Sequence, residues 1–148
     1  MMKQEIEKIE TLEFITKHNE CKKWLSEIET WESGSQFMRD LLLKFIVKLN
    51  DENRTLKIRT FHNDLDGVLQ RSIEWLRKKI NLQSSYIKFY FKKNHLKNPT
   101  DVRIQHDLLR KEVDQLRETY LELRSEFFDL IKPVLKKRRS QKGPRRAA

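Results

Sequence analysis

The sequence predicts an all-α protein, an antiparallel bundle of three long helices with coiled-coil-like packing. Only three glycines and three prolines occur among 148 residues, too few for the turns of an all-β sandwich or a βαβ fold. Charged residues make up 36% of the chain and hydrophobic residues 37%, which is typical of long amphipathic helices. Apolar residues also recur at alternating spacings of three and four, the pattern of a coiled-coil seam.

The first helix is expected over about residues 3–50. Its apolar positions keep one three–four rhythm: Trp24, Ile28, Trp31, Ser35, Met38, Leu42, Phe45 and Leu49. The rhythm passes through Ser33-Gly34-Ser35, where a turn is the alternative and would give four helices. If the helix is continuous, we expect Gly34→Ala to stabilise the protein by about 0.5–1 kcal/mol, because alanine loses less backbone entropy on folding.

The second helix is expected over about residues 54–94, after the polar segment Asn50-Asp51-Glu52-Asn53. Its seam contains Ile58, His62, Leu65, Leu69, Ile73, Leu76, Ile80 and Ile87. Gly67 lies inside this pattern and costs about 1 kcal/mol relative to alanine, which a helix of this length tolerates. Residues 86–91 have strand propensity by themselves, but the sequence offers no second strand, so we predict helix there as well.

The third helix is expected over about residues 99–132. Asn98 suits the capping position and Pro99 the first helical position. The seam contains Val102, Leu109, Val113, Leu116, Tyr120, Leu123, Phe127 and Leu130. Pro133 lacks an N–H group and clashes with the preceding turn, so we expect it to end or kink the helix near residue 132.

The charge of the chain is unevenly distributed. The formal net charge is +10, of which the last thirteen residues contribute +7. Residues 136–148 contain Gly143 and Pro144 and no acidic residue, so we expect a bundle over 1–135 followed by a basic disordered tail. Such a tail either contacts nucleic acid or an anionic membrane surface, or is simply solvated. The residues expected to make polyanion contacts are Lys136, Lys137, Arg138, Arg139, Lys142, Arg145 and Arg146.

A second candidate site is a group of aromatic residues at the end of the second helix. The predicted interaction patch contains Tyr86, Phe89, Tyr90 and Phe91, interleaved with lysines. Aromatic rings beside cations are typical of proteins that grip single-stranded nucleic acids. At 100° per residue, however, the patch covers about 200° of the helix, more than one neighbouring helix hides. Contact with further helices, including those of another copy, is therefore the favoured interpretation.

No catalytic, cofactor-binding or metal-binding residues are predicted. The sequence has no glycine-rich phosphate loop, no Cys-x-x-Cys and no His-Glu-x-x-His motif. Three histidines, His18, His62 and His106, fall on or beside the seams, so a metal held between helices is an alternative. A di-iron bundle would need a glutamate three residues before each histidine, and the residues found there are Ile15, Arg59 and Arg103.

The expected compartment is the cytoplasm. No apolar run approaches the roughly 18 residues of a membrane span, and the N-terminus has no hydrophobic signal core. The only cysteine, Cys21, cannot form an internal disulfide and is best interpreted as a small buried hydrophobic residue.

Residues 18–31, with the sequence HNECKKWLSEIETW, contain a histidine, then Trp24-Leu25-Ser26-Glu27-Ile28, then the aromatic Trp31. This segment resembles the opening helix of short bacterial coiled-coil proteins whose function is unknown. The resemblance covers about the first 50 residues and implies a helical fold without an activity. Those proteins usually carry charged residues where this chain has Ser33-Gly34-Ser35.

Together these observations predict a non-enzymatic, cytoplasmic helical interaction or scaffold module that binds itself or another helical protein. The alternative is an accessory protein that associates with nucleic acid through its basic tail. Ionic strength separates the two, since affinity that depends on phosphate contacts falls steeply with salt whereas an apolar helix interface barely responds.

Overall fold

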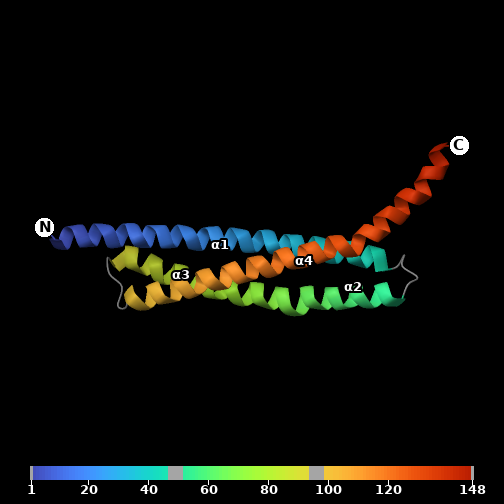
Figure 1. Cartoon of the computed structure of the whole chain (residues 1–148). Helices are drawn as coiled ribbons and strands as arrows, with labels where there is room; N and C mark the ends of the chain where they lie inside the picture. The colour runs from blue at the N-terminus through green and yellow to red at the C-terminus, as the bar shows by residue number, and fades with distance from the viewer. Residues whose placement is uncertain (1, 47–51, 94–98, 148) are drawn as a thin grey trace. The chain divides into compact units, whose positions relative to one another are not determined.

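The computed structural model describes residues 2–46, 52–93 and 99–147, and all regular structure in these ranges is helical (Figure 1). The elements in chain order are α1 (Met2–Ile46), α2 (Glu52–Asp64), the π-helix η1 (Leu65–Leu69), α3 (Gln70–Lys93) and α4 (Pro99–Ala147). Because α2, η1 and α3 follow one another directly, the described residues form three long helical segments. The predicted all-α, three-helix fold is confirmed, and the alternative break at Ser33-Gly34-Ser35 is wrong.

The chain is divided into two compact units, each built from parts of several helices. The first unit contains Met1–Glu32 and Ser72–Leu116. The second contains Ser33–Arg71 and Arg117–Ala148.

In the first unit, α3 runs antiparallel to α1. The hydroxyl groups of Thr11 and Tyr90 lie 3.3 Å apart near one end of the contact. Near the other end, Arg77 donates a hydrogen bond of 2.8 Å to Glu32. Contacts that move forward along α1 therefore move backward along α3, as in an antiparallel bundle.

The first unit's core follows the predicted seams closely. Its buried apolar side chains are Phe14, Cys21, Trp24, Ile28, Trp31, Ile73, Leu76, Ile80, Ile87, Tyr90, Val102, Leu109, Val113 and Leu116. The one gap in the predicted seam of α4, between Val102 and Leu109, is filled by the buried side chain of His106.

The second unit has its own core, in which two predicted positions are wrong. The buried side chains are Ser35, Met38, Leu42, Phe45, Ile58, Phe61, Leu65, Leu69, Tyr120, Leu123, Phe127 and Ile131. Phe61 takes the place expected for His62, since either residue keeps the three–four spacing and the more apolar one is buried. Ile131 is likewise buried where Leu130 was expected, because an α-helix of 3.6 residues per turn drifts away from a strict heptad repeat.

The π-helix η1 explains the altered register of the second segment. From Phe61, the buried positions Leu65, Leu69 and Ile73 follow at three successive spacings of four, one residue more than the three–four rhythm allows. The backbone N–H of Gln70 donates to the carbonyl of Leu65, five residues earlier. Such a π-turn absorbs one extra residue and returns the seam to the core.

Gly34 lies in the continuous helix α1 for a reason that the sequence does not reveal. A β-carbon built on Gly34 would overlap the hydroxyl oxygen of Tyr120 and approach its Cζ atom to 3.0 Å. The residue is therefore small because the Tyr120 ring occupies the space, and the structure predicts that Gly34→Ala destabilises the protein, contrary to the expectation from the sequence. At Gly67, in contrast, a β-carbon would meet no atom within 4 Å.

Helix α4 does not end near residue 132 but continues to Ala147. Pro133 removes one backbone hydrogen bond, yet its fixed φ angle is compatible with a helix, so the helix bends instead of stopping. In Figure 1 the red C-terminal part of α4 points in a different direction from the preceding part of the same helix. Residues 136–147 thus belong to this helix, where the sequence predicted a disordered tail.

Candidate interaction surface

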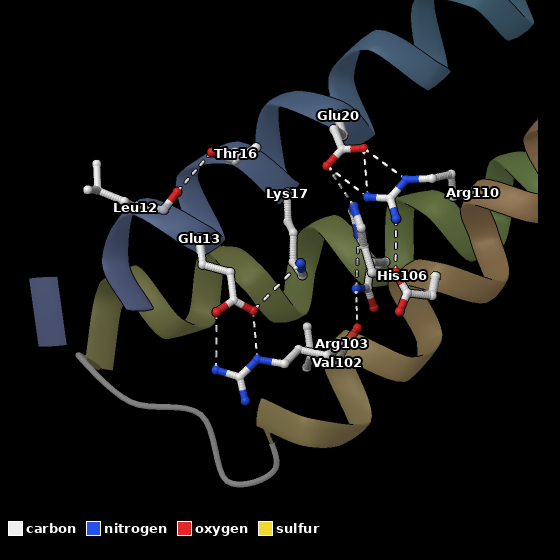
Figure 2. A network of polar contacts seen from close by, with 11 residues as sticks. Leu12, Glu13, Thr16, Lys17, Glu20, Val102, Arg103, His106 and Arg110 are labelled. Atoms are coloured by element: carbon white, nitrogen blue, oxygen red, sulfur yellow. Dashed lines mark hydrogen bonds and ion pairs between the residues drawn. The ribbon is translucent and has the colours of Figure 1, made fainter. Parts of the chain in front are cut away.

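Two ion pairs tie α1 to α4 in the first unit (Figure 2). Arg103 donates hydrogen bonds of 2.6 and 3.2 Å to the carboxylate of Glu13. Seven residues further along both helices, Arg110 donates to Glu20 at 3.0 and 3.1 Å. The bond to Arg103 is the main reason that the pKa of Glu13 lies below its ordinary value. Glutamate and arginine recurring at heptad spacing were a signal that the seam analysis missed.

His106 is the most deeply buried polar side chain of this unit. Its ring stacks at a tilt on Trp24, with centroids 4.7 Å apart, and its Nδ1 atom lies 3.4 Å from the Gln83 amide. Its Nε2 atom lies 3.5 Å from Glu20 and forms no hydrogen bond with any of the described residues. Burial lowers the pKa of His106, which keeps the imidazole neutral. Buried polar residues at core positions are known to specify helix register in coiled coils.

Two further titratable side chains of this unit, Cys21 and His18, have pKa values that are shifted by burial. Cys21 is completely buried, and this burial raises the pKa of its thiol to about 12, so the reactive thiolate is suppressed. Partial burial lowers the pKa of His18, whose Nδ1 atom lies 3.4 Å from the Ser84 hydroxyl.

A separate polar cluster lies beside the π-helix in the second unit. Arg39 donates to Asp66 at 2.9 Å, to the Ser35 hydroxyl at 2.7 Å and to Gln70 at 3.1 Å. The carboxylate of Asp66 also lies 3.3 Å from His62. Because Arg39 lies on α1 and Asp66 lies in η1, their ion pair holds α1 against η1. No group of three metal-binding side chains occurs among the described residues.

The outer side of α3 carries an apolar seam that sequence reasoning recognised only in part. Trp75, Leu82 and Phe89 follow one another at heptad spacing and are 62%, 56% and 48% exposed. Tyr86, four residues after Leu82, is exposed beside them. We call these four residues the α3 seam. Large apolar side chains that are exposed at a spacing which normally faces a partner helix make the α3 seam a candidate interaction surface.

The four residues of the predicted aromatic patch differ in their exposure in the structure. Tyr86 and Phe89 are exposed and belong to the α3 seam, as expected of an interaction patch. Tyr90 is only 5% exposed, and its ring packs on Phe14 with centroids 4.7 Å apart, so it belongs to the core and its place in the patch is wrong. Phe91 is partly exposed and lies edge-on to His18, away from the heptad positions.

Basic residues border the α3 seam. Residues 72–93 contain six basic side chains and one acidic side chain. Lys78 is exposed between Trp75 and Leu82, and Lys92 is exposed one turn after Phe89. Lys79 lies 5.0 Å from the Trp75 ring centroid and donates to Glu112 at 3.0 Å. The seam thus presents apolar and aromatic groups in a positive field.

The predicted polyanion contacts of the tail, Lys136 to Arg146, fall on residues whose side chains lie outside the described part of the structure. No helix in the ranges that the structure covers is long and apolar enough to cross a membrane.

Comparisons with known proteins give no match: no family model, no curated protein and no solved structure is similar to this chain. The resemblance of residues 18–31 to short bacterial coiled-coil proteins stays a prediction.

Proposed function

We propose that this chain is a non-enzymatic helical interaction module that associates with a second copy through the α3 seam. The observation that supports this is the exposure of Trp75, Leu82 and Phe89 at heptad spacing on a helix whose other side is already packed. We further propose a cytoplasmic location, where the free thiol of Cys21 stays reduced.

The expected strength of association follows from the size of the α3 seam. Complete burial of such side chains contributes about 1.5–3 kcal/mol each, and these start about half exposed, so covering the seam contributes roughly 3–6 kcal/mol. Apolar side chains of the partner add a similar amount. Association costs about 4–15 kcal/mol in lost translational and rotational freedom. Only the lowest of these costs leaves a favourable balance of as much as about 8 kcal/mol, so we expect association to be weak, with a Kd of about 1 µM at the tightest and about 1–100 µM as the range to test.

Sedimentation equilibrium tests this proposal. The intact chain should change from monomer to a larger species between about 1 and 200 µM, a range that brackets the expected Kd. The variant L82E should stay monomeric, because it places a carboxylate in the seam. The control I104E adds the same charge at an exposed isoleucine of α4 and should associate like the unmodified chain. A monomeric wild-type chain, or an L82E chain that associates like I104E, contradicts the proposal.

A second candidate function is supported by the lysines beside Trp75, Tyr86 and Phe89, since stacking rings and cations together bind single strands. In this alternative the chain is a nucleic-acid-associated accessory protein that uses its basic C-terminal residues as well. Nucleic-acid binding is supported if the protein binds a single-stranded oligonucleotide and this binding weakens steeply between about 50 and 200 mM salt. It is excluded if the protein does not bind the oligonucleotide at low salt.

A further inference from the structure

We infer that the α3 seam is covered by the N-terminal end of α1 from a second copy of this chain. This inference rests on the proposed function and names the occupant of the seam. The surface in question, which we call the N-terminal stripe, consists of Met2, Ile6, Ile9 and Leu12.

The N-terminal stripe is a second unpartnered apolar surface of the first unit. Ile6 and Ile9 are 59% and 66% exposed, and Met2 and Leu12 are exposed to a similar extent. At 100° per residue the four side chains lie within about 120° of one another around the helix, which is one face. The first buried residue of α1, Phe14, lies about 140° from Ile9, so the stripe does not face the protein's own core.

The α3 seam also points away from the core of its own unit. Three of its residues, Trp75, Leu82 and Phe89, each follow a buried isoleucine by two positions, and Tyr86 follows the buried Ser84 by two. Two residues correspond to about 200° around a helix, so the seam lies nearly opposite the buried side of α3. Since both surfaces face outward, a contact between them requires a second copy.

The charges of the two surfaces select this pairing over the alternatives. Residues 2–13 carry four glutamates and two lysines, whereas residues 72–93 carry six basic residues and one glutamate. Two α3 seams placed together would bring the exposed Lys78 and Lys92 of one copy near those of the other, which opposes association. The stripe of one copy on the seam of another instead joins an acidic helix to a basic one, as opposite charges flanking a coiled-coil seam do.

The two surfaces also match in length. The stripe spans about 15 Å from Met2 to Leu12, and the seam about 21 Å from Trp75 to Phe89, at 1.5 Å per residue. Because each copy carries both surfaces, a pair of chains closes into a dimer when each stripe lies on the partner's seam. Any geometry that does not close produces open chains of copies.

A mixing experiment with two complementary variants tests the inference on the full-length chain. I6K places a cation in the stripe and leaves the seam intact, and L82E places a carboxylate in the seam and leaves the stripe intact. Both substitutions use good helix formers at exposed positions, and circular dichroism should show unchanged helix content and melting. Each variant alone should be monomeric by light scattering at about 100 µM, the upper end of the expected Kd. An equimolar mixture should recover a dimer, since the L82E chain still offers its stripe to the seam of the I6K chain.

Each contrary outcome has a distinct meaning. If I6K associates like the wild type while L82E is monomeric, the seam is used but the stripe is not its occupant, so the inference fails and the proposed function stands. If both variants are monomeric and the mixture also stays monomeric, the contact is not made between unlike surfaces and the inference fails. A third outcome is that the wild-type chain is monomeric and binds a single-stranded oligonucleotide, and that L82E loses this binding. It overturns both the inference and the proposed function in favour of nucleic-acid binding.

Discussion

Gly34→Ala and Gly67→Ala are the same substitution in helices, and we expect them to change stability in opposite directions. Both remove backbone freedom from the unfolded chain, which alone stabilises by about 0.5–1 kcal/mol. At Gly34 the added β-carbon overlaps the Tyr120 hydroxyl and approaches Cζ to 3.0 Å. Because Tyr120 is buried, its ring has little room to turn aside.

The magnitudes follow from these opposing effects. Forcing a methyl group into a packed core costs about 1–3 kcal/mol, so Gly34→Ala should destabilise by up to about 2.5 kcal/mol after the entropic gain is subtracted. A change of 1 kcal/mol shifts the melting temperature of a chain of this size by about 2–4 °C. Gly34→Ala should therefore lower the melting temperature by up to about 10 °C, and Gly67→Ala should raise it by about 1–4 °C.

Thermal unfolding followed by circular dichroism measures both shifts. In a double-mutant cycle, Tyr120→Phe should recover part of the loss in the Gly34→Ala background, because it removes the overlapping oxygen but not the ring. The single variant Tyr120→Phe measures the stability that is lost with the hydroxyl group's own interactions. If Gly34→Ala raises the melting temperature as much as Gly67→Ala does, the contact with Tyr120 is absent and our explanation for the glycine is wrong.

Three further predictions concern the core, the buried histidine and the C-terminus. Leu116→Asp buries an unpaired carboxylate in the seam of α4 and should destabilise by several kcal/mol, seen as a collapse of the denaturant midpoint; an unchanged midpoint contradicts the burial of Leu116. The lowered pKa of His106 means that the unfolded chain binds more protons around pH 6.5 than the folded chain does, so the free energy of unfolding should fall as the pH drops from 7.5 to 5.5. His106→Gln should flatten this slope, and the contribution from the lowered pKa of His18 should remain. Deletion of residues 136–148 removes seven positive charges and should leave melting nearly unchanged but abolish retention on a polyanion column; equal retention of the two forms shows that these charges bind nothing.

The seams were predictable because burial in a helical bundle follows local periodicity. Trp24 through Phe45 and Leu109 through Phe127 are buried where the three–four rhythm places them. The exchange of His62 for Phe61 was predictable in principle, because both residues keep the three–four spacing between Ile58 and Leu65 and phenylalanine is the more apolar of the two. The Tyr120 ring against Gly34 was not, because it depends on how residues far apart in sequence approach one another.

Two of the four residues of the α3 seam were identified from the sequence. Tyr86 and Phe89 were identified as aromatic residues that one neighbour could not cover, but Trp75 and Leu82 were not connected to them. The missing signal is the second heptad repeat on α3, two residues out of phase with the buried isoleucines. Which aromatic residues are covered depends on where the neighbouring helices lie, so the burial of Tyr90 against Phe14 required the structure.

The fluorescence of Trp75 tests most directly whether a second copy covers the α3 seam. The other two tryptophans, Trp24 and Trp31, are only 5% and 6% exposed, so Trp75 dominates quenching by acrylamide. Quenching should decrease as the protein concentration rises through the expected Kd of about 1–100 µM, and Trp75→Phe should remove the concentration-dependent part. Quenching that stays constant while sedimentation shows association would place the contact elsewhere on the molecule and contradict our account of the α3 seam.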